Sequence, residues 1–242
     1  MGVHLERALV LVDLGRAAQA EEELRRALAE QPNNSTAHRL LAWCLATQGH
    51  LPQAQAEAEE AIRLQPDYDA AHRTLGWVLL QQRRWKEAEK ALREAIRLNP
   101  QDATHFFMLA HFFAQQKRWR DSEEAAREGL CLDPDNVNCA NSLAQALVYM
   151  DRPYEAQEIL KFVMAKDPEN ERAHIIQGVF YQRGNRPDQS LHHYREAARI
   201  NPENTMVHQC IKQLQEHPIA WASLLPIAYF IIKLIVYLMA KN

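Results

Sequence analysis

Glycine is scarce in this chain, with seven glycines among 242 residues. Active-site loops use glycine for backbone turns that other residues rarely adopt. The sequence also contains no glycine-rich phosphate loop, no HExxH zinc motif and no GxSxG nucleophile turn. These absences argue against an enzyme, and no catalytic, cofactor-binding or metal-binding residue is assigned from the sequence.

Cysteine and excess positive charge are lacking as well. The four cysteines, Cys44, Cys131, Cys139 and Cys210, form no CxxC pair, and no secretory signal begins the chain. We therefore expect reduced thiols in a cytosolic compartment and no disulfides. The net charge is −3, whereas a phosphate backbone attracts a positive surface, so nucleic acid is not expected as a partner.

Proline, in contrast, recurs at a fixed interval. Six prolines stand 34 residues apart without an insertion or deletion: Pro32, Pro66, Pro100, Pro134, Pro168 and Pro202. A constant period of this length indicates a chain built from stacked copies of one unit rather than a single globule.

Each 34-residue copy has the residue pattern of two closely packed helices. Three places, counted from the start of each copy, are nearly always small, and the eleventh place is large and apolar. The small places are the eighth (Ala8, Ala42, Gly76, Ala110, Ala144, Gly178), the twentieth (Ala20, Ala54, Ala88, Ser122, Ala156, Ser190) and the twenty-seventh (Ala27, Ala61, Ala95, Gly129, Val163, Ala197). Helices approach closely only where side chains are small. Each copy is therefore predicted to be a helical hairpin.

Turn-forming residues agree with this prediction. Each proline follows an apolar run and precedes cap-forming residues such as Asp135 or Glu203, so one helix should end there and the next begin. Within the copies, glycine or asparagine stands where a left-handed cap would end the first helix: Gly15, Gly49, Gly184 and Asn185. In the third and fourth copies, the same bend carries Arg83, Arg84, Lys117 and Arg118 instead.

The third copy, residues 69–102, carries the sequence features of a known family. Large, small, large, small, large, small and proline residues follow in that order at Leu75, Gly76, Leu79, Ala88, Leu92, Ala95 and Pro100. In this pattern the chain resembles the tetratricopeptide repeat family. The resemblance covers about residues 1–202 in six repeats, and residues 203–217 are similar to the single helix that caps such arrays.

The resemblance implies an all-α fold. It would be a right-handed superhelical α-solenoid of six 34-residue helix-turn-helix repeats, with a capping helix and an apolar C-terminal helix. One departure is the fourth place, where the family favours an aromatic residue. Histidine fills it five times, at His4, His38, His72, His174 and His208. We interpret this column as amphipathic core histidines, with a metal or pH sensor as the alternative. The adjacent pair His192 and His193 is interpreted as a solvated polar face.

Protein binding is the function that the resemblance implies, on a concave surface lined by the first helix of each repeat. The inward-facing places would be the fifth and ninth. They give Arg39, Trp43, Arg73, Trp77, Phe107, His111, Asn141 and Gln145. The arginines suit carboxylates, the aromatic rings suit apolar side chains and the amides suit a peptide backbone, which favours an acidic, aromatic peptide ligand. The alternative is that both tryptophans only pack against the next helix.

A well-known subgroup of the family clamps the carboxyl end of a chaperone peptide with lysine and asparagine. The corresponding places here are Leu5 and Leu9, or Arg39 and Trp43, and lack that pairing. A clamp of that type is therefore not predicted, although Arg39 and Arg73 remain suited to an acidic ligand of another geometry.

The composition changes after His217. Residues 219–240 hold a single charge, Lys233, and 22 residues of helix would span roughly 33 Å, enough to cross a bilayer core. Pro226 would kink such a helix. The segment could span a membrane as a tail anchor, lie in the interface, or fold back as an apolar cap or dimer contact.

Two functions follow from these observations. The first is a non-enzymatic scaffold held at a membrane by residues 219–240, with its repeats facing the cytoplasm. The second is a soluble cytoplasmic adaptor whose apolar tail caps the array or mediates homo-oligomerisation. No cofactor is expected for either.

Overall fold

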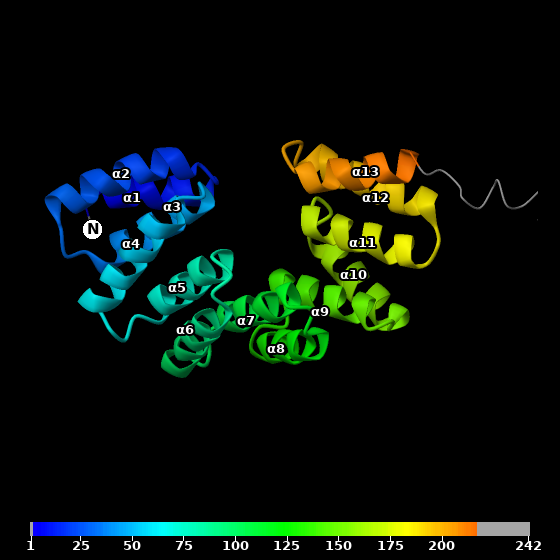
Figure 1. The fold of residues 1–242 in the computed structure, drawn as a ribbon, viewed down its shortest axis with the longest axis horizontal. Coiled ribbons are helices and arrows are strands. Elements are labelled where there is room, and N and C mark those ends of the chain that lie inside the picture. The colour runs from blue at the N-terminus through cyan, green and yellow to red at the C-terminus, as the bar shows by residue number, and fades with distance from the viewer. Residues whose placement is uncertain (1, 217–242) are drawn as a thin grey trace, which may run out of the picture. The chain divides into compact units, whose positions relative to one another are not determined.

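The computed structural model describes residues 2–216 of the chain, and every regular element among them is an α-helix (Figure 1). The helices are α1 (Val3–Asp13), α2 (Ala17–Glu30), α3 (Ser35–Thr47), α4 (Leu51–Leu64), α5 (Asp69–Gln81), α6 (Trp85–Leu98), α7 (Ala103–Gln115), α8 (Trp119–Leu132), α9 (Val137–Tyr149), α10 (Pro153–Lys166), α11 (Glu171–Arg183), α12 (Pro187–Ile200) and α13 (Thr205–Glu216). The all-α prediction is confirmed for this part of the chain.

The chain divides into two compact units. The first is Met1–Met150 and the second is Asp151–Asn242. The boundary falls between α9 and α10, inside the fifth predicted repeat. The first unit contains the hairpins α1–α2, α3–α4, α5–α6 and α7–α8, followed by α9, and the second contains α10, the hairpin α11–α12, and α13 packed on α12.

The small columns lie where helices pack closely. A Cβ at Gly76 would meet Leu92 of the same hairpin, and a Cβ at Gly129 would meet Cys139 of the next helix, α9. Residues at the eighth, twentieth and twenty-seventh places are buried in every repeat. Where the twentieth place is serine, its hydroxyl donates to a carbonyl of the partner helix: Ser122 Oγ to Ala110 O at 2.9 Å and Ser190 Oγ to Gly178 O at 2.8 Å. The buried hydroxyls are therefore satisfied by the same close approach that the small residues permit.

The turn inside each hairpin has one left-handed residue at the fifteenth place. Its φ is +71° at Gly15 and +83° at Gly49, and the same conformation is adopted by Arg83, Lys117, Asp151 and Asn185 at 55° to 60°. In the first hairpin, Gly15 N donates to Val12 O at 2.9 Å and Arg16 N to Leu11 O at 2.8 Å. This pair of bonds is the Schellman motif, which closes the end of the first helix. The predicted bends at Arg83 and Lys117 are confirmed, and in the sixth repeat the left-handed residue is Asn185 rather than Gly184.

Replacing Lys117 by glycine is expected to stabilise the first unit by about 0.5–1 kcal/mol. A left-handed conformation costs a residue with a side chain about 1–2 kcal/mol, and glycine gives back part of that through its freedom in the unfolded chain. The reverse change, Gly49→Lys, should destabilise by a similar amount. Chemical denaturation of the two variants measures both effects, and equal stabilities would contradict the assignment of strain to this place.

Asparagine or aspartate at the thirty-fourth place caps the turn between repeats, except in the second repeat, where the place is Tyr68 and its side chain makes no cap bond. Asn136 Oδ1 accepts a hydrogen bond from Cys139 N at 3.0 Å, and Asn204 Oδ1 accepts one from Val207 N at 3.3 Å. The capping residues therefore follow Asp135 and Glu203 by one position, which corrects the sequence prediction. The shift is explained by the extended backbone of Asn136, with φ −69° and ψ 97°, which is the conformation that a helix N-cap requires.

The apolar segment 219–240, with its predicted anchor, cap and dimer roles, lies outside the described residues. Within residues 2–216, none of the helices combines the length and the apolar character needed to span a bilayer.

Candidate functional site

The eight residues predicted to contact a partner, here called the first-helix row, lie in pairs on α3, α5, α7 and α9 of the first unit. These helices contact one another in chain order, so the row crosses four neighbouring helices. The members of each pair are four residues apart and therefore share one side of their helix. The row is thus a continuous strip within this unit.

Two tryptophans form the apolar part of the row. The rings of Trp43 and Trp77 stack with centroids 6.4 Å apart and planes inclined by 25°. Both side chains pack on the core cluster of the first unit, yet both are only partly buried. The indoles are therefore anchored by the core and still reach the surface, and their contact with a partner stays a prediction.

The two arginines of the row differ in how their charges are balanced. Arg39 Nε donates to Tyr68 Oη at 2.8 Å, and within residues 2–216 no carboxylate forms an ion pair with Arg39. Arg73 Nη1 donates to Asp102 Oδ2 at 3.0 Å. Burial lowers the pKa of Arg73, the charge of Asp102 opposes this and the charge of Arg39 adds to it. Arg39 is thus the uncompensated positive charge beside the tryptophans.

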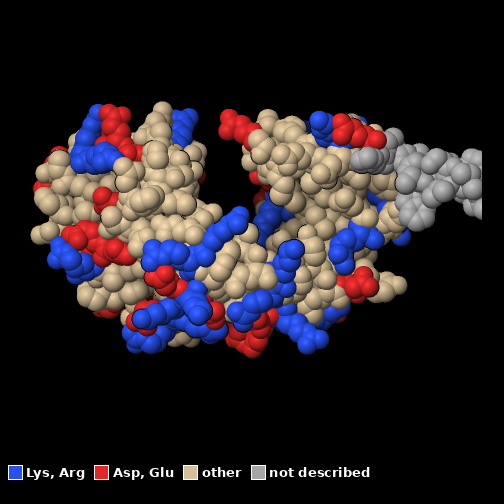
Figure 2. All heavy atoms as spheres, in the orientation of Figure 1, with Lys and Arg blue, Asp and Glu red and all other residues tan. Residues whose placement is uncertain are grey.

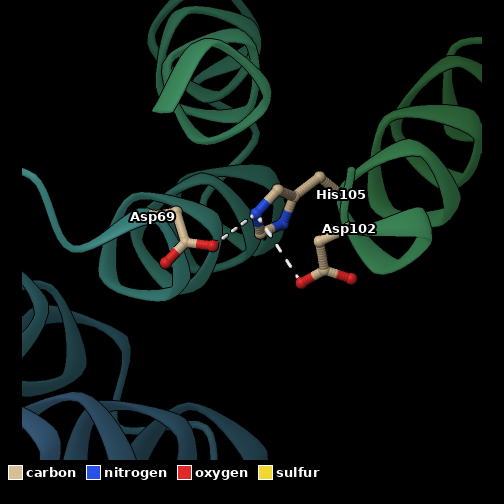
Figure 3. A group of neighbouring side chains, drawn as sticks. All are labelled: Asp69, Asp102 and His105. Carbon is tan, nitrogen blue, oxygen red and sulfur yellow. Dashed lines mark hydrogen bonds and ion pairs between the residues drawn. The ribbon is translucent and has the colours of Figure 1, made fainter. Parts of the chain in front are cut away.

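Arg73 belongs to a polar network that joins α5 to α7. Figure 3 shows three other members of this network, Asp69, Asp102 and His105. Arg73 Nη1 also donates to His105 Nδ1 at 3.1 Å, and His105 Nε2 donates to Asp69 Oδ2 at 2.9 Å. The Asp69 carboxylate accepts a second bond, from Asn99 Nδ2 at 3.0 Å. His105 is fully buried, and its burial lowers the pKa of the imidazole. This network could not be read from the sequence, because its members are up to 36 residues apart and only the bond from Asn99 to Asp69 has a counterpart, from Asn201 to Glu171 in the sixth repeat.

The same network contains the one group of three metal-ligating side chains found in residues 2–216. Ligand atoms of Asp69, Asp102 and His105 lie within 4.8 Å of one another. However, His105 Nδ1 accepts a bond from Arg73, so its proton is on Nε2 and is donated to Asp69. Neither ring nitrogen then offers a lone pair, and the Arg73 charge repels a cation. In this arrangement the network holds Arg73 in place rather than forming a metal centre.

The C-terminal half of the row is less apolar. The rings of Phe107 and His111 lie 6.3 Å apart on α7 and are partly exposed. On α9, Asn141 is buried, with 1% of its surface exposed, whereas Gln145 is partly exposed. The row therefore reaches the surface at seven of its eight places, and Asn141 is the exception.

The histidine column has a structural role that the sequence did not explain. In four of the five cases, Nε2 lies at hydrogen-bond distance from the carbonyl oxygen of the proline six residues earlier. The pairs are His38 with Pro32 (2.9 Å), His72 with Pro66 (2.9 Å), His174 with Pro168 (3.1 Å) and His208 with Pro202 (2.8 Å). Because a carbonyl only accepts, Nε2 carries a proton in each. The column thus fastens the turn between repeats to the next helix.

In three of the five histidines, Nδ1 faces the residue 19 positions later, on the second helix of the same hairpin. His4 Nδ1 bonds Glu23 Oε2 at 2.7 Å and His38 Nδ1 bonds Glu57 Oε2 at 2.6 Å. In the sixth repeat the partner is His193, whose Nδ1 lies 3.1 Å from His174 Nδ1. The interpretation of His193 as part of a solvated face is therefore wrong. Its ring is partly buried against His174 of the neighbouring helix α11.

In the third repeat the partner place is Ala91, and a cavity lies there. It has a volume of about 610 Å³ and is lined by Glu59 and Ile62 of α4, His72, Leu75 and Leu79 of α5, and Glu87, Lys90, Ala91 and Glu94 of α6. Alanine is too short to reach the His72 ring, and no hydrogen-bond partner of His72 Nδ1 occurs among the described residues. The missing side chain at this place accounts for the space.

Charged side chains of both signs are intermixed over the visible surface (Figure 2). On the second helices, most pair within their own helix, as in Arg93 with Glu89 at 2.8 Å and Arg97 with Glu94 at 2.7 Å. Exposed pairs of this kind contribute little to stability and leave no strong field of one sign. They do not form a binding patch.

Comparison with known proteins settles the family. A family model described as tetratricopeptide repeat matches residues 5–69, 46–103, 73–137 and 141–205. The chain belongs to the tetratricopeptide repeat family. No curated protein matches this tetratricopeptide repeat chain.

Solved structures with the same fold are numerous. A chain of the APC/C hetero-tetramer Cut9–Hcn1 has a TM-score of 0.72 at 16% identity, over 87% of this chain and 42% of that one. The Pseudomonas aeruginosa pilF structure has a TM-score of 0.65 at 21% identity, over 88% and 95% of the two chains. YrrB, described as a TPR protein with an unusual peptide-binding site, has a TM-score of 0.51 at 19% identity, over 78% and 97%. Identities this low show a shared tetratricopeptide repeat fold and nothing more specific.

Proposed function

We propose that this protein is a non-enzymatic interaction scaffold that binds a partner peptide on the first-helix row. The observation that carries the proposal is the stacked pair Trp43 and Trp77, partly exposed beside Arg39. Aromatic and arginine side chains at a surface supply most of the binding energy in protein interfaces. Membership of a family whose repeats mediate protein interactions supports the same conclusion.

The ligand that suits this strip is an extended segment with acidic and aromatic residues. Arg39 has no ion-pair partner among residues 2–216 and can form a charge-assisted pair with a carboxylate. The two indoles offer apolar surface next to it, and Phe107 and His111 extend the ring surface on α7. Arg73 contributes less charge than its place in the row suggests, because Asp102 already balances it. The peptide-binding site reported for YrrB supports a peptide as the ligand class.

Capture of partners from a lysate by the full-length chain tests the proposal. The variant Trp43→Gln with Trp77→Gln uses the residue that Gln145 supplies at the same place in the fifth repeat. Each lost tryptophan is expected to cost about 2 kcal/mol or more, about 30-fold in affinity, so specific capture should disappear. Tyr154→Ala is the matched control, because Tyr154 is a surface aromatic of α10 with 84% of its area exposed.

The outcome that contradicts the proposal is a folded double variant, judged by circular dichroism, that captures the same partners as the wild type. A further variant, Arg39→Gln, separates charge from ring contact. It should weaken capture of acidic partners and lower the dependence of capture on salt.

The apolar segment 219–240 supports two roles for the scaffold, attachment to a membrane or contact with its own array or a second copy. We favour the adaptor role, in which the segment covers protein, because interaction is the property that the family shares. Carbonate washing of cell membranes distinguishes the two. Release of the chain supports the adaptor role, and retention in the pellet supports membrane anchoring on the cytoplasmic side.

A further inference from the structure

His174 and His193 bring two imidazole nitrogens together in the second unit. His174 lies on α11 and His193 on α12, and their Nδ1 atoms are 3.1 Å apart. His174 is 5% exposed and His193 is half-buried. Nothing in the first-helix row or in the proposed scaffold function makes use of this pair.

The protonation of the pair follows from its partners. His174 Nε2 faces Pro168 O at 3.1 Å and must donate there, which leaves a lone pair on Nδ1 of the neutral ring. His193 Nδ1 then donates to it. Burial lowers the pKa of His193 to about 4, and the neighbouring His174 and His192 act in the same direction, so this ring is neutral at neutral pH. Neutral imidazole is the form that ligates metal ions.

Both rings are held in orientation by groups other than each other. A histidine that donates its remote N–H to a backbone carbonyl, as His174 does to Pro168, has the outer contact typical of metal-bound histidines. The His193 ring stacks on Tyr181, with centroids 5.3 Å apart and planes inclined by 5°. The two nitrogens therefore do not depend on their mutual hydrogen bond for their positions.

The separation of the nitrogens is close to what one metal ion requires. Two nitrogens at 2.0–2.1 Å from a tetrahedral Zn²⁺ are about 3.3 Å apart. We propose that His174 Nδ1 and His193 Nδ1 bind a single Zn²⁺ ion, or another divalent ion that prefers imidazole. On binding, the His193 proton moves from Nδ1 to Nε2, so both rings stay neutral and no net proton is released. Water fills the remaining positions.

One carboxylate of α12 interacts with the pair. Glu196 lies three residues after His193, and its charge raises the pKa of His193, while the charges of His174 and His192 lower the pKa of Glu196. Arg199 Nε donates to Glu196 Oε2 at 2.9 Å and balances its charge, so the proposal depends on the two ring nitrogens and not on a negative field. The contrast with His105 is informative, because there an arginine occupies one ring nitrogen and a carboxylate accepts the proton of the other. The sixth repeat has neither obstacle.

The full-length chain, stripped of metal by a chelator, is titrated with Zn²⁺ by calorimetry and with Co²⁺ by visible absorption. The double variant His174→Ala with His193→Ile copies Ala140 and Ile159, which occupy the same places in the fifth repeat, so it is expected to fold. The matched control, His38→Ala with Glu57→Ile, makes the same exchange in the second repeat.

Wild type and control are expected to bind one more equivalent of Zn²⁺ than the double variant, or to bind Zn²⁺ at least about tenfold more tightly. A tenfold loss of metal affinity is the lower end of what disturbing the surroundings of a metal site typically causes. The Co²⁺ spectrum should lose its nitrogen-ligand bands only in the double variant. His193→Gln, which keeps a donor toward His174, is the second variant should the double one fail to fold, and it should bind as weakly. Equal binding by wild type and either site variant, or equal loss in the control, overturns the proposal.

Discussion

Gly178→Val is expected to destabilise the second unit by about 3 kcal/mol. A Cβ added at Gly178 would lie 2.6 Å from Cε1 and 2.8 Å from Cδ1 of Tyr194, closer than real side chains approach. Tyr194 is 1% exposed and packs with Ala197 and Val207, so its ring has no space into which to retreat. Overpacking of a rigid core costs about 1–3 kcal/mol, and the branched valine lies at the upper end of that range.

Hydrogen exchange of the α11 and α12 amides measures this effect locally, and thermal unfolding measures it for the whole chain. The control is Gly184→Ala, because a Cβ there would meet only carbonyl oxygens at 3.5 and 3.6 Å and the φ of −78° suits any residue. Alanine at this place should be neutral or stabilising by about 0.5 kcal/mol. Unchanged protection of α11 and α12 in Gly178→Val would show that the ring yields, and that the close approach does not fix this hairpin.

His105→Ala is expected to cost the first unit about 2–4 kcal/mol. The change removes a fully buried ring and leaves Arg73 Nη1 and Asp69 Oδ2 each with one partner fewer. Alanine at the same place in other repeats, Ala37 and Ala71, shows that the helix itself tolerates it. Urea denaturation measures the loss. A change below about 0.5 kcal/mol would show that the network contributes nothing to holding α5 against α7.

The same variant should alter the pH dependence of stability. Burial lowers the pKa of His105 below its ordinary 6.5, so below that pH the unfolded chain binds a proton that the folded chain does not. This part of the stability is present above about pH 6.5 and is lost as the pH falls. The free energy of unfolding should therefore fall more steeply between about pH 7 and pH 5 in the wild type than in His105→Ala. Parallel curves would contradict the role of His105.

Much of the fold could be predicted because several positions of the repeat each indicate the same helical hairpin. The small columns identify the helix crossings, and the prolines identify the turns, since both recur on one period. The left-handed turn residues at Arg83 and Lys117 were harder to predict, because nothing in those residue types favours that conformation. The Schellman hydrogen bonds, rather than the local residue, impose it.

The candidate site was less accessible to sequence reasoning. The positions of the row on α3, α5, α7 and α9 followed from the period, but the balance of charge on Arg73 did not, because Asp102 and His105 belong to the next repeat. The histidine pairs were missed for a related reason. Helical spacings of three and four residues do not reveal these pairs, because the contacts join residues 19 apart on two helices of one hairpin.

The contact across 19 residues limits how such a chain can be recombined. Histidine at the fourth place faces a polar residue in three repeats, and Phe106 and Ala140 face Ala125 and Ile159. The exception is His72, which faces Ala91 beside the cavity of the third repeat. Exchanging one helix between other repeats would create further mismatches of this kind, and a buried polar atom without a partner costs about 1–3 kcal/mol. Exchanging both helices together keeps every pair intact. The smallest unit that can be exchanged between repeats is therefore the whole hairpin. Designs that recombine repeats should place their junctions in the turns between hairpins.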